Sequence, residues 1–328
     1  MRIATRHRFP MLCVLCLLVA GGPATVQGGD AVPPARIADG VQMIEGRYVP
    51  GAQPDGNSVL FFAREGAVVF DTGRHVAQAD RIAAALDAAG RPLAAIVNSH
   101  WHLDHISGNP RLLARWPQAR TYAGDALDGA LHGFLARYRA QLVDMRGRTT
   151  DAAQRADWGD EIARIDAAAQ AHPTLPITAP GERTIAGTSF VFGTARAATL
   201  GDVWLYDPAS RVLASGDLVT LPAPFFDTAC PARWRAAFTA LADTGFTTLV
   251  PGHGAPMERA DFDNYRRAFH NLLACAAAPT RDATCIAGWK RDAAPLLRPG
   301  DDAVVDSLLG YYLSTGLRER AAQPDCKD

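Results

Sequence analysis

The densest group of side chains with chemical potential lies in residues 98–109, NSHWHLDHISGN. His100, His102, Asp104 and His105 fall within six positions, although the whole chain has only nine histidines. In an extended segment, residues 100 and 102 point to the same side of the backbone. Imidazole nitrogens and carboxylate oxygens are ligands that zinc accepts and that iron and manganese tolerate. The spacing therefore predicts a metal site.

Two later residues have the same character. Asp217 ends the predicted strand RVLASGD, and His253 lies in the segment TTLVPGHG, where another predicted strand meets a loop. An aspartate at the end of a strand commonly serves only as a cap or turn residue. Functional side chains, however, gather on the loops that a rigid scaffold positions. Taken in order with the first cluster, Asp217 and His253 are interpreted as further ligands.

The order HWHLDH, ASGD and PGHG resembles the metallo-β-lactamase-fold superfamily, and VVFDTG at 68–73 resembles its early strand and turn. The likeness covers roughly residues 40–256, and the H-x-H-x-D-H signature is highly specific. The resemblance implies an α/β fold, an αββα sandwich of two mixed sheets flanked by helices. It also implies one or two zinc ions at one edge of the sheets, with iron or manganese not excluded.

The same resemblance implies a role for each of the six residues. One ion would be bound by His100 and His102. A second ion would be bound by Asp104, His105 and His253, and Asp217 would bridge the two ions.

One position departs from the family pattern. The family has a GHTPGD-like turn that supplies a third histidine to the first ion, whereas this chain reads AATLGD at 197–202 and has Ala198 in that place. The loss of a residue that merely supports a ligand costs about 10- to 100-fold in metal affinity, so a missing ligand should cost at least as much. Three readings follow. Water completes the first site, the second site alone is filled, or His75, His132 or His172 reaches in.

The chemistry that such a centre predicts is hydrolysis of a small molecule. A metal lowers the pKa of bound water toward ~7, so that metal-bound hydroxide is available at neutral pH, and it can polarise a carbonyl group. Asp104 is expected to orient the hydroxide and is the predicted catalytic residue. An ester, thioester, lactone or amide is the expected substrate. Trp101, Phe225 and Phe226 are either the walls of an apolar cleft or ordinary packing residues.

The branch of the family is indicated by two features. An acidic residue at the position of Asp217 resembles the glyoxalase-II-like and lactonase-like enzymes more than the true β-lactamases. The stretch GDLVTLPAPFFDTACPARW at 216–234 is similar to exported hydrolases associated with quinoprotein systems. Ala198 keeps two alternatives open. One is a non-catalytic metal-binding or maturation protein with a degenerate first site, and the other is a weak β-lactamase.

The elements that must position these residues can be read from the hydrophobic pattern. Residues 41–73 predict strands with a hairpin around REG, 76–90 a helix, and 93–97 a buried strand that runs straight into the histidine cluster. Residues 125–171 predict an inserted pair of helices broken near RGRTT, and 258–328 a helical C-terminal extension. The role of the insertion stays open, and a lid over the cleft is one reading.

The first 28 residues predict a signal peptide, because three arginines precede the apolar run FPMLCVLCLLVA and the sequence VQG follows as a cleavage site. The rival reading, a membrane anchor, is disfavoured because the run is shorter than the ~20 residues that a spanning helix needs. We therefore expect residues 29–328 to form a single periplasmic or secreted domain without stable membrane insertion.

The charge and the cysteines fit an exported protein with no nucleic-acid partner. The net charge of the whole chain is −1, and no basic stripe is visible. Four cysteines follow the predicted signal peptide, and an even number in an exported protein suggests disulfides. We pair Cys275 with Cys285, across the predicted loop AAAPTRDAT, and Cys230 with Cys326. Four free thiols are the alternative, and whether the protein has a protein partner is not indicated by the sequence.

Overall fold

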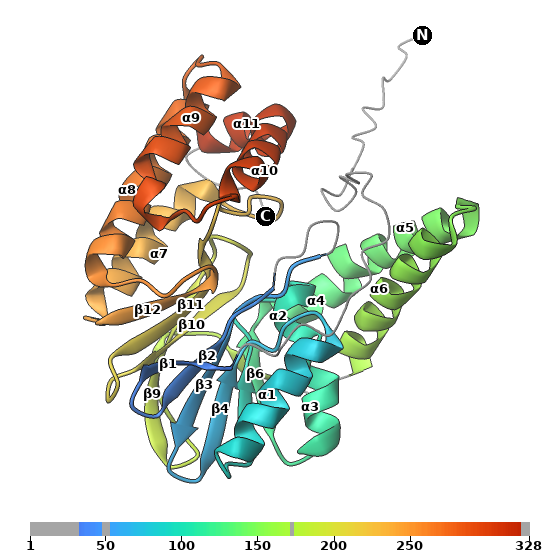
Figure 1. Cartoon of the computed structure of the whole chain (residues 1–328), viewed down its shortest axis with the longest axis vertical. Helices are drawn as coiled ribbons and strands as arrows, with labels where there is room; N and C mark the ends of the chain where they lie inside the picture. Colours follow the sequence, from blue (N-terminus) through green and yellow to red (C-terminus); the bar gives the residue numbers. More distant parts are fainter. Residues whose placement is uncertain (1–32, 48–52, 171–173, 323–328) are drawn as a thin grey trace.

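Two β-sheets face each other and helices cover their outer sides in the computed structural model of this chain (Figure 1). The structure describes residues 33–47, 53–170 and 174–322. The predicted signal peptide at 1–28 and Cys326 of the second predicted disulfide lie outside these residues. The layer order confirms the predicted αββα sandwich.

The first sheet has seven strands in chain order and is mixed. Its first four strands pair antiparallel, and the remaining strands continue in parallel. The short strands β1 and β7 were missed by the hydrophobic pattern. The strands are β1 (Ala35–Ala38), β2 (Val41–Ile44), β3 (Ser58–Ala63), β4 (Gly66–Phe70), β5 (Leu93–Val97), β6 (Arg120–Gly124) and β7 (Thr174–Ile177).

The second sheet has five strands in the order β12-β11-β10-β9-β8 and is also mixed, because β11 and β12 are parallel. Strands β10 and β11 form a hairpin, and the Asp207 carboxylate accepts hydrogen bonds from the backbone N–H groups of Ala209 and Ser210 in its turn. The strands are β8 (Gly181–Ile185), β9 (Thr188–Ala195), β10 (Asp202–Asp207), β11 (Val212–Thr220) and β12 (Thr248–His253).

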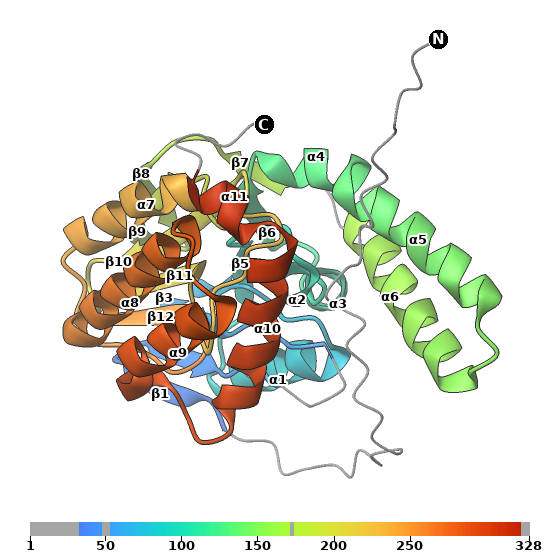
Figure 2. The same cartoon turned by 90° about the horizontal axis from the view of Figure 1, so that it is seen from above.

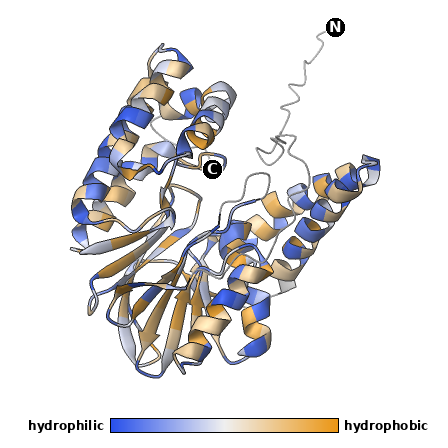
Figure 3. Ribbon diagram, viewed as in Figure 1, coloured by the Kyte–Doolittle hydropathy of each residue, from blue (hydrophilic) through white to orange (hydrophobic). Residues whose placement is uncertain are grey.

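An apolar core fills the space between the sheets. The strands of both sheets accordingly carry many residues coloured as hydrophobic in Figure 3. Phe61 of β3 and Phe190 of β9 meet edge to face across it, with ring centroids 5.7 Å apart. Every residue of β11 is buried, which explains why its sequence has no polar alternation. A fully packed β11 gives Asp217, near its end, a rigid base.

Two pairs of helices cover the outer faces. The first sheet packs against α1 (Val76–Ala88) and α3 (Asn109–Arg115), and the apolar residues Ala79, Ile82 and Leu86 of α1 face that sheet at helical spacing. The second sheet packs against α7 (Pro231–Asp243) and α8 (Arg259–Ala277).

The insertion contains a projecting helical hairpin. Helices α5 (Phe134–Arg148) and α6 (Ala152–Gln170) lie side by side and extend away from the sheets (Figure 2). The predicted pair of helices and the break near RGRTT are confirmed, and a short helix, α4 (Ala126–His132), precedes them. The base of the hairpin shares an apolar cluster with Trp101, Leu103 and Ile106, which belong to the histidine-rich loop.

The C-terminal extension predicted at 258–328 is helical over its described residues. After α8 it contains α9 (Asp282–Asp292), a short 3-10 turn (Ala294–Leu296), α10 (Asp301–Thr315) and α11 (Leu317–Ala322). The predicted Cys275–Cys285 disulfide is confirmed, with the Cα atoms 5.5 Å apart. The predicted loop between these cysteines is shorter than expected. Alanine is the best helix former, and α8 continues through the alanines to Ala277.

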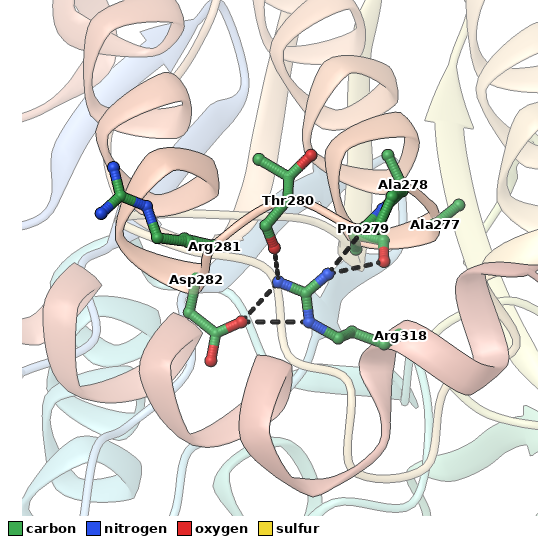
Figure 4. Close-up of a pocket in the computed structure, with 8 residues that line it drawn as sticks. Ala277, Ala278, Pro279, Thr280, Arg281, Asp282 and Arg318 are labelled. Atoms are coloured by element: carbon green, nitrogen blue, oxygen red, sulfur yellow. Dashed lines mark hydrogen bonds and ion pairs between the residues drawn. The ribbon is translucent and has the colours of Figure 1, made fainter.

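Arg318 of α11 closes the loop that joins α8 to α9 (Figure 4). Its guanidinium donates hydrogen bonds to the carbonyl oxygens of Ala276, Ala278 and Thr280 and to the carboxylate of Asp282. It lies beside a surface hollow of about 650 Å³ that none of the six candidate ligands lines. This arginine therefore has a structural role, because one side chain satisfies the carbonyl groups left at a helix end.

None of the helices within the described ranges is long and apolar enough to cross a bilayer.

We predict that Arg318→Ala lowers the free energy of unfolding by about 2 kcal/mol, because three carbonyl groups lose a charged hydrogen-bond donor. The loss is limited because the Arg318 side chain is partly exposed to water. Urea denaturation followed by circular dichroism measures this change. Arg281→Ala on the same loop is the control, because Arg281 points away from Arg318 in Figure 4, and it should cost less than about 0.5 kcal/mol. Equal losses in the two variants would show that the closure is not specific to Arg318.

Candidate metal centre

The histidine-rich loop is fixed by polar side chains on both of its flanks. It leaves β5 at Val97 and turns into the short helix α2 (Leu103–Ile106). The side-chain amide of Asn98 donates to the backbone carbonyl of His105 at 3.0 Å, and Asn109 donates to the Asn98 side chain at 2.7 Å. Thr72 donates to Asn109 at 2.7 Å. The loop is therefore fastened to itself and to the turn after β4.

The structure brings all six predicted residues together in two adjacent groups. His100, His102 and Asp217 form the first group, and within each group the potential ligand atoms lie within 4.8 Å of one another. Asp104, His105 and His253 form the second group. Loop 98–105 therefore meets β11 at Asp217 and the end of β12 at His253. The prediction that Asp217 ends its strand is wrong, because β11 continues to Thr220.

Asp217 lies between the two groups. Its Oδ2 is 3.7 Å from His100 Nε2, whereas its Oδ1 is 3.3 Å from His105 Nε2 and 3.6 Å from His253 Nε2. Asp104 Oδ2 completes the second group at 3.1 Å from His253 Nε2. The two oxygens of one carboxylate thus face different groups, which is the geometry of a bridging ligand.

Buried polar atoms without partners mark the centre as a place for a cation. His100 Nε2, His105 Nε2, His253 Nε2 and both carboxylate oxygens of Asp217 have no hydrogen-bond partner among the described residues. Such buried atoms are rare in folded proteins, and each one calls for an explanation. Because nitrogen and oxygen donors converge here, the residues fit a zinc-type ion.

The remaining nitrogen of each histidine in loop 98–105 has a partner that orients the ring. His100 Nδ1 lies 2.8 Å from Ser99 Oγ, and His105 Nδ1 lies 2.8 Å from Asp71 Oδ2. His102 instead uses Nε2, 3.0 Å from Thr228 Oγ1, which leaves its Nδ1 available. Partners of this kind fix the tautomer and the direction of a ligating imidazole. Sequence reasoning missed Thr228 and the role of Asp71.

Glycines make room for this arrangement. A Cβ atom on Gly252 would lie 2.0 Å from Asp217 Oδ1, and one on Gly56 would lie 2.6 Å from His105 Cε1. Real Cβ contacts are not this short, so a side chain at either position would displace a candidate ligand. The glycine of the PGHG motif is therefore required by the close approach of Asp217.

The turn that contains Ala198 keeps its shape without the histidine. The Asp202 carboxylate accepts hydrogen bonds from the backbone N–H groups of Ala197 and Ala198 and from both the N–H and the hydroxyl of Thr199. Thr228 donates to the Ala198 carbonyl at 3.0 Å and also contacts His102. The turn is thus held beside the first group, but it contributes no ligand to it.

His75 and His132, two of the histidines considered as replacements, belong to neither group. His75 Nδ1 is 2.9 Å from the carboxylate of Asp55, and His132 is exposed on α4. His172 lies outside the described residues. Replacement of the missing ligand by His75 or His132 is therefore wrong, because neither imidazole is placed with the first group.

Burial sets the charge state of the first group. Burial, together with the neighbouring imidazoles, lowers the pKa of His100 well below its usual value, and burial lowers the pKa of His102 to about 4. Both rings are consequently neutral at neutral pH. A neutral imidazole has the lone pair that a metal requires.

The second group is governed by its carboxylates. Burial alone would lower the pKa of His105, but Asp217, Asp71 and Asp104 together raise it well above the usual value. For Asp104 the directions are reversed. Burial alone would raise the pKa of this carboxyl group, but the charges of His105, His253 and Arg74 hold it well below its usual range. Asp104 is therefore an ionised carboxylate that can only accept hydrogen bonds.

The aromatic residues near the centre differ in their surroundings. Phe225 is partly buried and meets His253 edge to face, with ring centroids 5.4 Å apart. Trp101 contacts His102 but is buried against Phe134 of α5. Phe226 is fully buried in the core and does not line a cleft. Of the three, Phe225 is the one that both contacts a residue of the centre and is partly exposed.

Residues 53–253 match the family model described as the metallo-beta-lactamase superfamily. The chain belongs to this superfamily. The matched segment contains the histidine-rich loop, β11 and β12, and it includes all six residues of the centre.

Curated relatives of this superfamily member are hydrolases. The chain is 35% identical over 107 residues to a hydroxyacylglutathione hydrolase of Synechococcus sp. (strain CC9902), covering 29% of this chain and 41% of that protein. It is 28% identical over 222 residues to a linear primary-alkylsulfatase of Pseudomonas sp. (strain ATCC 19151), covering 60% of this chain and 40% of that protein. These matches span less than half the length of either relative. They support a metal-dependent hydrolase.

Solved structures show the same fold. A metallo-beta-lactamase from Pontibacter korlensis superimposes with a TM-score of 0.52 at 18% identity, over 73% of this chain and 98% of that one. The sec-alkylsulfatase Pisa1 from Pseudomonas sp. superimposes with a TM-score of 0.55 at 19% identity, over 89% of this chain and 50% of that one. At these identities the likeness concerns the fold alone.

We predict that Gly252→Ala lowers zinc affinity by at least about 10-fold, because the added methyl group must displace Asp217 Oδ1 from its position between the groups. Competition with a chromogenic chelator measures the affinity. Gly147→Ala on α5 is the control, because a Cβ there meets nothing within 4 Å, and zinc affinity should not change. Unaltered affinity in Gly252→Ala would contradict the bridging position of Asp217.

Proposed function

We propose that this protein is an exported, metal-dependent hydrolase that attacks an ester, thioester, lactone or amide. The proposal is carried by one observation, the convergence of unpartnered imidazole nitrogens on both oxygens of the buried Asp217 carboxylate. Export is supported by the N-terminal sequence pattern and by the Cys275–Cys285 disulfide, since disulfides persist in oxidising compartments.

The six residues would hold the metal in two unequal sites. Asp104, His105, His253 and the Oδ1 of Asp217 form the more complete set. The other set has His100, His102 and the Oδ2 of Asp217, with Ala198 where the family pattern has a histidine. We therefore infer that the second site binds its ion more tightly and that the first site has an open position.

A bound zinc-type ion lowers the pKa of water and polarises the bond under attack. The protein's own residues orient the reaction around that chemistry. Asp104, held ionised by its surroundings, accepts a hydrogen bond from the attacking water and directs it toward the substrate. Phe225, against His253, offers an apolar contact to the substrate beside the reacting bond.

We predict that the purified mature protein carries at least one zinc-type ion per chain and hydrolyses at least one member of a substrate panel. The panel contains a thioester, a lactone, an aryl ester, a chromogenic β-lactam and a primary alkyl sulfate, the last because of the alkylsulfatase relatives. A chelator should abolish the activity, and added zinc should restore it. A fully loaded protein without turnover on any member would instead favour a non-catalytic accessory role.

A separate prediction concerns the open position. Ala198→His should raise the metal content toward two ions per chain, because a third nitrogen donor reaches the first group. Elemental analysis after equilibration at a fixed free zinc concentration measures this content. Ala198→Phe supplies a ring of similar size without a donor and should leave the stoichiometry as in the wild type. An identical stoichiometry in the histidine variant would place the missing ligand elsewhere.

A further inference from the structure

A chain of buried charges connects the inserted hairpin to the candidate metal centre. Arg74 follows the turn after β4 and is only 7% exposed. Its Nη2 lies 3.9 Å from Asp104 Oδ1, while its Nη1 donates a hydrogen bond to Glu161 Oε1 on α6. Helix α6 of the insertion therefore places the Glu161 carboxylate behind the candidate ligand Asp104, with the Arg74 guanidinium between them.

Glu161 is an unusual residue for its position. It is 4% exposed, although α6 belongs to a hairpin that projects from the body of the protein. A charged residue is seldom buried to this extent unless it is paired. Its second oxygen accepts a hydrogen bond from Arg164 Nη1 at 2.9 Å, and the adjacent Ile162 packs in the apolar cluster with Leu103. Glu161 is therefore held firmly against Arg74.

The distances around Asp104 show how its two oxygens are divided. Oδ2 faces the second group, 3.1 Å from His253 Nε2 and 3.6 Å from His105 Nε2. Oδ1 faces Arg74 at 3.9 Å, which is too long for a hydrogen bond. The guanidinium makes its hydrogen bond to Glu161 instead. Arg74 is thus near enough for its charge to act on Asp104 and too far to bind its lone pairs.

An arginine released from Glu161 would have Asp104 as its nearest carboxylate. A guanidinium pairs with a carboxylate in a two-pronged manner that engages both oxygens. A direct Arg74–Asp104 pair would therefore compete with a cation for Asp104. The competition is avoided as long as Glu161 occupies the donor face of Arg74.

We propose that Glu161 is a positioning residue of the metal centre, which restrains Arg74 and so leaves Asp104 free to bind the second ion. The inference rests on the proposed function and gives the inserted hairpin a task in it. The hairpin supplies, from α6, the outermost member of a Glu161–Arg74–Asp104 chain. Its contribution to the site is electrostatic and does not require the hairpin to move.

The experiment compares zinc affinities of the full mature chain by chelator competition, at a temperature well below the unfolding transition of every variant. Glu161→Gln should weaken zinc binding by about 10- to 100-fold, the range expected for residues that support ligands. The double variant R74M/E161Q removes the competing guanidinium and should return to within about threefold of the wild type. This recovery is the decisive result, because a purely structural role of Glu161 would not be corrected by a second substitution at Arg74.

Asp166→Asn is the matched control. Asp166 lies on the same helix and pairs with Arg139 of α5, at the exposed side of the hairpin. The Asp166–Arg139 pair joins the two helices away from the histidine-rich loop, so its loss should leave zinc affinity unchanged. Weakening in Asp166→Asn equal to that in Glu161→Gln would overturn the inference, because any damage to the hairpin would then suffice.

The outcomes separate this inference from the proposed function. If the wild type binds zinc but hydrolyses no panel substrate, the proposed function is wrong. The zinc affinities of the wild type, Glu161→Gln and R74M/E161Q still decide the role of Glu161. If the wild type is active and folded Glu161→Gln binds zinc as tightly, the inference alone is wrong. If Glu161→Gln fails to fold, R74M/E161Q is compared with R74M. Without the Arg74 guanidinium, Glu161 has nothing to restrain, so the two variants should have the same zinc affinity, and a difference between them would overturn the inference. A wild type that binds no zinc overturns both.

Discussion

The site depends on the buried carboxylate of Asp217. A charge enclosed in protein is costly unless an opposite charge or hydrogen bonds compensate it, and neither oxygen of Asp217 has a hydrogen-bond partner among the described residues. Imidazole nitrogens approach it from both sides, at 3.3 and 3.7 Å for the nearest member of each group. A cation is the simplest species that satisfies all of these atoms together. Gly252 and the fully buried strand β11 keep this position available.

The two halves of the centre differ in their support as well as in their ligands. In the second group the partner that orients a candidate ligand is charged, because the Asp71 carboxylate lies 2.8 Å from His105 Nδ1. The first group is oriented by hydroxyl groups, Ser99 on His100 and Thr228 on His102. Charged partners hold a ligand more strongly than neutral ones. The asymmetry that Ala198 introduces is therefore continued in the surrounding residues, and it favours tight binding at the second group.

The fold and the six central residues are predicted because short motifs, in this order along the chain, resemble those of the metallo-β-lactamase superfamily. The motifs HWHLDH, ASGD and PGHG are each a few residues long, so they can be recognised without knowledge of distant contacts. The supporting residues are different, since Thr228 and Glu161 lie 126 and 87 positions from the residues they orient. Nothing in their own neighbourhoods distinguishes them from ordinary threonine or glutamate. The short strands β1 and β7 were missed for a related reason, because each has four residues and acquires its stability from a neighbour.

The apolar cluster beneath the inserted hairpin adds a second connection to the one through Arg74. The histidine-rich loop contributes Trp101, Leu103 and Ile106 to this cluster, and the hairpin contributes Leu135 of α5 and Ile165 of α6. The loop and the base of the hairpin consequently bury each other's apolar surface, so the ordered form of each favours the other. If a cation binds only the ordered loop, docking of the hairpin strengthens cation binding, and cation binding stabilises the docked hairpin. The two free-energy changes are equal, because coupling between two binding events is reciprocal. The hairpin is thus better described as part of the metal centre's support than as an independent appendage.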